Sequence, residues 1–175
     1  VRQGFIPESD EALVSIFGND MANSSRGQLE ANGSGLKMTR GDLALRVNFS
    51  TIESLKSGKI IDRRAGRTLT TSEAEILSKA LNKIKLPCDF EFKTTIQHRA
   101  VLVLRGGFSD NITSNDYAYS KGETINLEKI GEFKPLDEDE NSVYTANILK
   151  EFIDKAYEVL NTHPINEERR KKGLM

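Results

Sequence analysis

Apolar and polar residues alternate with two different periods along the chain, and each period predicts one kind of element. Residues 43–49, LALRVNF, place an apolar side chain at every second position, which is typical of a strand with one buried face. The apolar set is Leu43, Leu45, Val47 and Phe49. The same alternation puts Arg46 and Asn48 together on the opposite face, away from the core.

Three further segments are predicted to be strands. Residues 59–62 follow a serine-glycine turn and form a short strand. Residues 88–92, CDFEF, alternate, with the cysteine and both phenylalanines directed inward. Residues 100–104, AVLVL, are apolar on both faces, which predicts the central strand of the sheet.

Helical spacing of apolar residues predicts three helices. The first follows Ser9, a suitable N-cap, and continues to a Gly-Asn-Asp stop. The second opens with a capping box from Ser72 to Glu75 and ends at Pro87. Its apolar stripe is Ile76, Leu77, Ala80, Leu81 and Ile84. The third is a long amphipathic helix over residues 143–160.

Segments without either period are predicted to be loops. Residues 23–35, NSSRGQLEANGSG, are rich in Gly, Ser and Asn and indicate an irregular loop. Residues 106–140 are loop-rich and end in an acidic run, and a basic tail follows His163. Strands and helices in this order predict an α+β fold, a compact layered domain with a mixed or antiparallel sheet flanked by helices.

The composition excludes several classes of protein. The 175 residues fit one ordinary domain, or one domain with a small appendage. With 25 basic and 26 acidic residues, no whole-molecule field draws in nucleic acid or a membrane. The single cysteine, Cys88, excludes an internal disulfide and suits a reducing cytoplasm, and no signal peptide or membrane-spanning apolar run is present in the sequence. Because the chain opens with VRQGF, without an initiator methionine, we expect a piece of a longer protein.

The segment 60–67, IIDRRAGR, concentrates positive charge in a chain whose formal net charge is −1. Its polar members are Asp62, Arg63, Arg64 and Arg67. A solvated turn is one explanation for an isolated basic cluster. The other is ligand binding, because the planar guanidinium group binds phosphate or carboxylate through paired hydrogen bonds. Arginines from several strand ends could together hold a small ligand with several negative charges.

The two ends of the predicted central strand offer alternative positions for such a ligand. His98 and Arg99 enter the strand and Arg105 leaves it, so about 23 Å separates His98 from Arg105 at about 3.3 Å per residue. We favour the His98 end, because an imidazole can hydrogen-bond a phosphate near neutral pH. A purely structural, hydrogen-bonded role for His98 is the alternative. Arg105 and Asp110 are expected to form a salt bridge that pins a loop.

Other kinds of site find little support in the sequence. Two histidines and one cysteine, without HxH or HExxH spacing, make a zinc site built by this chain alone improbable. Neither a Walker loop nor a GxGxxG motif is present. Ser9 at a helix N-terminus could accept a phosphoryl group if a metal lowered its pKa, although plain capping is the commoner role.

Six motifs occur in the order found in one protein family. They are PESD (7–10), GDLALRVNF (41–49), IIDRRAGR (60–67), HRAVLVLRG (98–106), SDN (109–111) and HPINEERRKKG (163–173). Together they resemble the archaeal-type cofactor-independent (2,3-bisphosphoglycerate-independent) phosphoglycerate mutases, members of the alkaline phosphatase-like metalloenzyme superfamily. The resemblance runs from one end of the chain to the other.

The resemblance implies a two-domain enzyme. A phosphatase-like domain would hold two divalent metal ions (manganese, zinc, cobalt or magnesium) and a phosphoryl-carrying serine, with no 2,3-bisphosphoglycerate as cofactor. An inserted domain would bind the glycerate and reorient it between C2 and C3. Residues 1–35 would belong to the phosphatase-like domain and the connection, residues 36–162 to the insert, and residues 163–175 to a return linker. Ser9 falls on the nucleophile position and could ligate a metal, while the other metal ligands would lie outside this chain.

The expected function is therefore part of a phosphoglycerate mutase, an isomerase that interconverts 2- and 3-phosphoglycerate through a phosphoserine in cytoplasmic glycolysis and gluconeogenesis. Without the other metal ligands, this chain alone is expected to be inactive. Its partner would be a phosphorylated three-carbon acid, with no nucleic acid or membrane, and the oligomeric state stays open. The substrate-binding residues would be Arg46, Asn48, Asp62, Arg63, Arg64, Arg67, His98 and Arg99. The alternatives are a non-catalytic anion-binding module, a metal-dependent phosphomonoesterase of the same superfamily, and an RNA-binding α+β domain.

Overall fold

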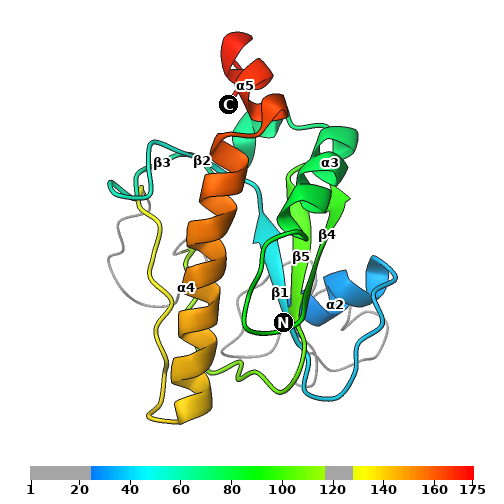
Figure 1. Cartoon of the computed structure of the whole chain (residues 1–175), viewed down its shortest axis with the longest axis vertical. Helices are drawn as coiled ribbons and strands as arrows, with labels where there is room; N and C mark the ends of the chain where they lie inside the picture. The colour runs from blue at the N-terminus through cyan, green and yellow to red at the C-terminus, as the bar shows by residue number, and fades with distance from the viewer. Residues whose placement is uncertain (1–24, 117–127) are drawn as a thin grey trace, which may run out of the picture.

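The computed structural model describes residues 25–116 and 128–175, and these residues confirm the predicted α+β class (Figure 1). The described helices are α2 (Arg26–Gly33), α3 (Thr71–Leu81), α4 (Glu140–Asn161) and α5 (Pro164–Lys171), with a 3-10 turn η2 (Ala65–Arg67). The strands are β1 (Leu43–Asn48), β2 (Thr51–Ile52), β3 (Ile60–Asp62), β4 (Phe90–Ile96) and β5 (Arg99–Leu104). The helix predicted after Ser9 lies outside the described residues.

The main sheet has three antiparallel strands in the order β1-β5-β4. Strand β5 is central, as the apolar run over residues 100–104 predicts, and the side chains of that run are buried on both faces of the sheet. Strands β2 and β3 form a separate two-stranded antiparallel pair. The sheet therefore belongs to the antiparallel alternative of the predicted fold.

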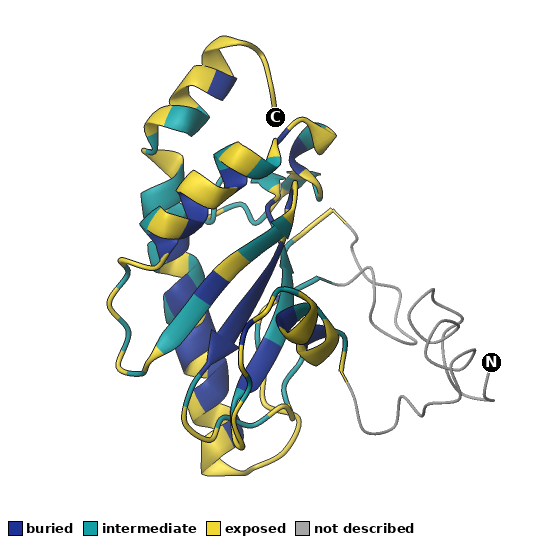
Figure 2. Ribbon diagram, turned by 90° about the vertical axis from the view of Figure 1, so that its right-hand side faces the viewer, coloured by how far each residue is buried: buried dark blue, intermediate teal, exposed yellow. Residues whose placement is uncertain are grey.

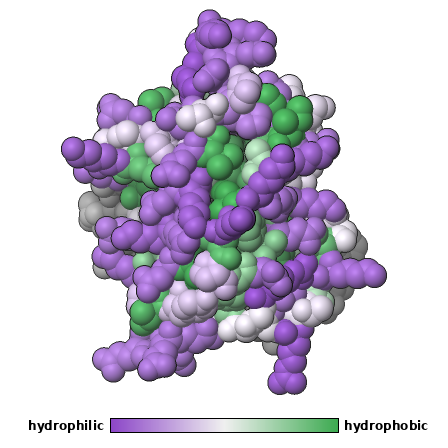
Figure 3. Space-filling model, in the orientation of Figure 1, coloured by the Kyte–Doolittle hydropathy of each residue, from purple (hydrophilic) through white to green (hydrophobic). Residues whose placement is uncertain are grey.

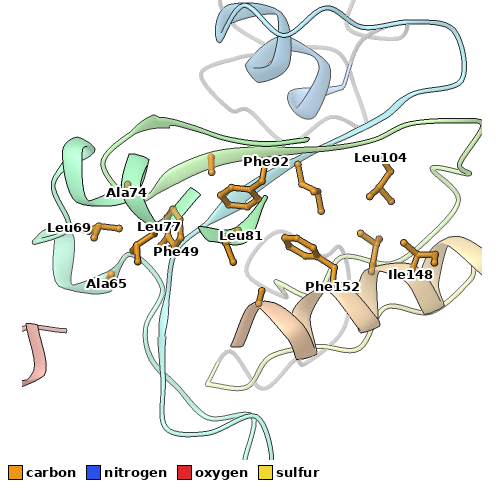
Figure 4. Close-up of a cluster of buried hydrophobic side chains, with 14 of the residues drawn as sticks. Phe49, Ala65, Leu69, Ala74, Leu77, Leu81, Phe92, Leu104, Ile148 and Phe152 are labelled. Atoms are coloured by element: carbon orange, nitrogen blue, oxygen red, sulfur yellow. The ribbon is translucent and has the colours of Figure 1, made fainter. Parts of the chain in front are cut away.

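Helices cover both faces of the three-stranded sheet, and Figure 2 shows the sheet between α4 and α2. The larger core lies on the α3 and α4 side, where the rings of Phe49, Phe92 and Phe152 pack together (Figure 4). The ring centroids of Phe92 lie 5.7 Å from Phe49 and 6.0 Å from Phe152. A smaller apolar cluster lies under α2 and consists of Ala31, Leu36, Ala44, Val101 and Val103.

The prediction of an irregular loop over residues 23–35 is wrong, because α2 forms there. A capping box starts the helix: the Gln28 N–H donates to the Ser25 hydroxyl at 3.2 Å, and the Ser25 N–H donates to the Gln28 side chain at 3.0 Å. Gly27 is buried against the sheet, where a Cβ atom would lie 1.8 Å from the carbonyl oxygen of Ala44. This glycine serves close packing rather than flexibility.

The predicted limits of the second helix are also wrong. Helix α3 is capped by Thr70 with Glu73, two residues before the predicted box, and it ends at Leu81. The Asn82 side chain ends it by bonding both the N–H and the carbonyl of Phe92, at 2.8 and 2.7 Å. The buried stripe is Ala74, Leu77, Ser78 and Leu81, so Ile76 is exposed instead of inward.

The basic tail after His163 is helical. His163 caps α5 through a hydrogen bond from the Ile165 N–H to Nδ1 at 3.3 Å, and Pro164 occupies the first turn. The predicted domain limits, 1–35, 36–162 and 163–175, stay predictions, although α2 contacts β1 and β5, and α5 contacts α4. Within residues 25–116 and 128–175, no helix has the length and apolar character needed to cross a membrane.

Candidate anion-binding site

Polar side chains from two strands gather where β1 ends and β5 begins. Asn48 lies directly opposite Arg99, and Arg46 lies opposite Val101. Since Val101 belongs to the cluster under α2, the alternation of the strands places Arg46, Asn48 and Arg99 on this same face. The predicted shared face of Arg46 and Asn48 is confirmed. It is not an open surface, however, because Arg46 Nε lies 3.5 Å from Glu30 Oε1 of α2.

His98 occupies the tight turn between β4 and β5, at the same end of the sheet. Its side chain is buried, with 8% of the residue exposed. The His98 carbonyl accepts a hydrogen bond from the Phe49 N–H at 2.7 Å, which fastens the turn to the end of β1. The neighbouring Gln97 N–H donates to the Thr71 hydroxyl of α3 at 3.1 Å. These bonds fix the turn that carries the imidazole relative to β1 and α3.

The third part of the site is the turn that follows β3. One oxygen of the Asp62 carboxylate accepts hydrogen bonds from the N–H groups of Arg64 and Gly66, at 2.7 and 2.9 Å. These backbone bonds, from Gly66 and then Arg64, lower the pKa of Asp62. Ala65, Gly66 and Arg67 follow in left-handed conformations, with φ of 47°, 62° and 55°. The aspartate thus shapes the backbone from which two arginines project.

Backbone strain is concentrated around His98. In the described part of the chain, the non-glycine residues with positive φ are Ala65, Arg67 and Gln97. Ala65 and Arg67 belong to the turn after β3, and Gln97 lies directly before His98 in the β4–β5 turn. Left-handed conformations of such residues cost about 1–3 kcal/mol each and collect at functional sites. The strain therefore marks the same place as the arginines.

The electrostatics of His98 indicate that these segments converge. Burial has the largest effect on its pKa and lowers it below the usual value of 6.5. The same pKa is lowered further by the positive charges of Arg99, Arg64, Arg67 and Arg46, in decreasing order. Guanidinium groups from β1, β5 and the turn after β3 thus act on one imidazole. The result is a neutral histidine at pH 7 in a strongly positive surrounding, which suits an anionic ligand.

A hollow of about 650 Å³ lies beside this group, between α2 and the sheet. Its polar lining includes Arg26, Glu30, Arg46, Lys93, Thr94 and Arg99. Four buried polar atoms of these segments make no hydrogen bond among the described residues: Arg46 Nε, Asn48 Oδ1, Thr94 Oγ1 and His98 Nδ1. Of these residues, Arg46 and Thr94 line the hollow. Buried polar atoms are normally paired, so their clustering points to a ligand or ordered water.

A larger cavity of about 1230 Å³ runs along β1 and α4. Much of its wall is made of core side chains such as Leu45, Leu149 and Ile153. Figure 3 shows apolar surface in the middle of this face, between hydrophilic side chains. An apolar wall does not replace the hydration of a ligand with several negative charges. The smaller hollow is mainly polar, although the larger cavity also reaches Arg46, Asn48 and Arg63.

Two of the arginines considered from the sequence are engaged elsewhere. Arg63 forms an ion pair with Asp116. Arg105 donates to Asp42 at 2.5 Å, to Glu91 at 3.1 Å and to the Lys37 carbonyl at 2.8 Å. The predicted structural role of Arg105 is confirmed, but its carboxylate partners differ from the expected Asp110. Ser9 lies outside the described residues.

The described residues do not fit the two metal ions that the motifs imply. In residues 25–116 and 128–175, no group of three or more His, Cys, Asp or Glu side chains could hold a metal ion. What these residues can do is hold an anion and orient it.

Some members of the hollow were missed from the sequence. Lys93 and Thr94 lie on β4, whereas the predicted strand ended at residue 92. The β-prone run Thr94–Ile96 was the signal that could have extended it. Arg26 was assigned to a loop, and the capping pattern of Ser25 with Gln28 was the signal for α2.

Several known proteins that are similar to this chain carry one description. A family model described as 2,3-bisphosphoglycerate-independent phosphoglycerate mutase matches residues 1–166. The enzyme of that name from Aeropyrum pernix is 44% identical over 190 residues, which cover 100% of this chain and 44% of the relative. The one from Thermococcus kodakarensis is 47% identical over 180 residues, which cover 99% of this chain and 40% of the relative. This chain thus spans less than half the length of these curated relatives.

A solved structure supports the same similarity. The cofactor-independent phosphoglycerate mutase from Thermoplasma acidophilum DSM 1728 superposes with a TM-score of 0.74 at 32% sequence identity. The superposition covers 97% of this chain and 44% of that one. Sequence and fold therefore agree over nearly the whole chain.

Proposed function

Because the chain belongs to the 2,3-bisphosphoglycerate-independent phosphoglycerate mutase family, we propose that it is the part of such a mutase that holds the phosphoglycerate during isomerisation. The substrate would be 2- or 3-phosphoglycerate, a phosphorylated three-carbon acid. Its binding residues would be Arg46, Asn48, Arg64, Arg67, His98 and Arg99. Arg63 and Asp62 would act at the margin, since one is paired with Asp116 and the other shapes the turn.

The observation that carries this proposal is that Arg46, Asn48 and Arg99 share one face where β1 ends and β5 begins, next to the buried His98. Burial, and then the charges of Arg99, Arg64, Arg67 and Arg46, lower the pKa of His98, which agrees with this arrangement. Phosphoglycerate has a charge of about −3 near neutral pH, and its phosphate and carboxylate lose hydration on binding. Fixed guanidinium groups offset that loss through charge-assisted hydrogen bonds, each about twice as strong as neutral ones. Neutral His98 can add one further hydrogen bond through its unpartnered Nδ1.

Retention of the glycerate distinguishes a mutase from a phosphatase. After the phosphoryl group leaves one hydroxyl, the dephosphorylated acid must stay bound and present its other hydroxyl. Arginines on three different segments can keep hold of a carboxylate while the carbon skeleton turns. Holding and orienting the acid is therefore the task proposed for the described residues.

The remaining parts of the enzyme are proposed from family membership. Ser9, outside the described residues, would receive the phosphoryl group as a phosphoserine. Two divalent metal ions would be held by ligands outside the described residues. The reaction would belong to cytoplasmic glycolysis and gluconeogenesis, and no 2,3-bisphosphoglycerate would be required.

An activity comparison tests the proposal. The 175-residue chain and a chain extended at both ends to the length of the relatives are incubated with manganese and 3-phosphoglycerate. We expect the extended protein to form 2-phosphoglycerate and the shorter chain to be inactive. Release of free phosphate without isomerisation would identify a phosphatase instead. Lack of both reactions in the extended protein would leave the anion-binding module as the better description.

A further inference from the structure

We propose that Arg169 of α5 is a positioning residue for the anion site, because it holds the backbone of the turn that carries Arg64 and Arg67. This inference rests on the proposed function of that site. Arg169 is one of the arginines of the basic segment EERRKK, which has no assigned role in the site. Only 5% of Arg169 is exposed, whereas the adjacent Arg170 is exposed to solvent.

The guanidinium group of Arg169 reaches across to the turn after β3. Its Nη1 donates to the Thr68 carbonyl at 3.1 Å, and its Nη2 donates to the Thr68 hydroxyl at 2.8 Å and to the Ala65 carbonyl at 3.4 Å. Arg169 Nη1 also lies 3.6 Å from the Glu73 carboxylate, which offsets its buried charge. One side chain of α5 therefore binds both ends of η2 and the first turn of α3.

This contact falls on the strained part of the site. Ala65, Gly66 and Arg67 hold their left-handed conformations only while the surroundings favour them. Asp62 binds the turn from one side through the N–H groups of Arg64 and Gly66. Arg169 binds it from the other side through carbonyl groups. The N–H groups of the turn thus bond to Asp62, and its carbonyl groups bond to Arg169.

A displacement of this turn changes where the arginines point. Arg64 and Arg67 are attached to it directly, and both charges act on His98. A misplacement of about 1 Å can cost about 100-fold in a site that depends on orientation. Arg169 bonds the turn and, like Arg64 and Arg67, does not line the hollow, so its proposed effect on the ligand passes through the positions of these two charges. The position of α5 would then set the geometry of the anion site.

Calorimetry on the 175-residue chain with 3-phosphoglycerate tests this role. Arg169→Met removes every donor while keeping a long apolar side chain, and Arg169→Lys keeps the charge but not the fork. We expect about tenfold weaker binding for Arg169→Met and a smaller loss for Arg169→Lys. The matched control is Arg170→Gln, because Arg170 donates to the Asn161 carbonyl, away from the turn. The affinity of this variant for 3-phosphoglycerate should stay within about twofold of the wild-type value.

A double-mutant comparison separates positioning from general loss of structure. In a chain that already carries Arg64→Gln and Arg67→Gln, Arg169→Met should weaken binding no further, because its path to the ligand is gone. An equal loss from Arg169→Met in both backgrounds would overturn the inference. If Arg169→Met does not fold, Thr68→Val removes the hydroxyl that accepts from Arg169 and donates to the carbonyls of Ala65 and Met175, and it should weaken binding in the wild-type background but not in the Arg64→Gln, Arg67→Gln chain. If the Arg64→Gln, Arg67→Gln chain binds as tightly as wild type, the proposed function itself fails.

Discussion

We propose that His98 and the polar atoms around it are arranged to hold a ligand. The imidazole is buried among guanidinium groups, and its Nδ1 has no partner among the described residues. Asn48 Oδ1 also has no hydrogen-bond partner among the described residues. Each buried, unpaired polar atom costs about 1–3 kcal/mol. Conflicts of this kind between local rules are expected at functional sites, where the ligand or its water resolves them.

The pH dependence of stability should report the surroundings of His98. The folded chain holds the pKa of His98 below the unfolded value of 6.5, so the unfolded chain binds the proton first as the pH falls. This contribution to stability is therefore present above that pH and is lost as the pH falls through it. Between about pH 7.5 and about pH 5.5, wild type should lose more unfolding free energy than His98→Gln.

Urea unfolding of both proteins across this range measures the difference. If the unfolding free energies of wild type and His98→Gln change in parallel with pH, the folded and unfolded chains bind this proton equally. A larger loss of unfolding free energy in His98→Gln than in wild type would contradict the predicted direction of the His98 pKa shift. Sulfate, whose charge does not change in this range, should reduce the wild-type loss if it binds next to the imidazole.

Which residues would meet was only partly predictable from the sequence. Strand alternation was enough to put Arg46 beside Asn48, and the length of β5 was enough to separate His98 from Arg105. The approach of Arg64 and Arg67 to His98 depends on η2, a turn shaped locally by Asp62 and held by Arg169, which lies about a hundred residues further along the chain. The role of Arg169 could not be predicted from the sequence either, because nothing within the run RRKK indicates which side chain is buried.

At the scale of elements, strands were predicted better than helix ends. Alternation over residues 43–49 and the apolar run 100–104 depend on burial, which tertiary packing reinforces. The start of α3 was ambiguous because two overlapping capping boxes exist, at Thr70 and at Ser72, each with a glutamate three residues later. Packing of Ala74 and Leu77 against the sheet selects the first box.

Helix α2 was missed because its glycines suggested flexibility, and Gly27 offers a test of the opposite view. We expect Gly27→Ala to destabilise the chain by about 1–3 kcal/mol or more, because its Cβ would meet the carbonyl of Ala44. The matched control is Gly33→Ala in the same helix, where no atom lies within 4 Å of the added Cβ. That change should stabilise by about 0.5–1 kcal/mol, as alanine does in a helix.

Chemical denaturation of both variants measures these effects. Equal stabilities of Gly27→Ala and Gly33→Ala would mean that α2 does not pack closely on β1. Since α2 also forms one wall of the hollow, we expect Gly27→Ala, which would displace the helix from β1, to weaken anion binding.

At the scale of the whole molecule, the site is assembled from segments that are distant in the sequence. β1, the turn after β3, the β4–β5 turn and α2 all contribute to one end of the sheet. A chain of net charge −1 thus acquires a local concentration of positive charge without a basic surface overall. Only the resemblance to a family could suggest a phosphorylated ligand in advance, because spacing alone does not reveal which strand ends become neighbours.

The central claim is that these guanidinium groups form one site for a phosphorylated three-carbon acid, and NMR titration of the 175-residue chain with 3-phosphoglycerate tests it most directly. We expect saturable amide shifts confined to residues 46–48, 64–67 and 97–99. Arg99→Gln should weaken binding about tenfold or more, since a hydrogen bond to a charged group contributes about 1.5–3 kcal/mol. Arg40→Gln, exposed at the opposite end of β1, should leave it unchanged. Shifts gathered around Arg105, or equal affinities for wild type and Arg99→Gln, would contradict the claim.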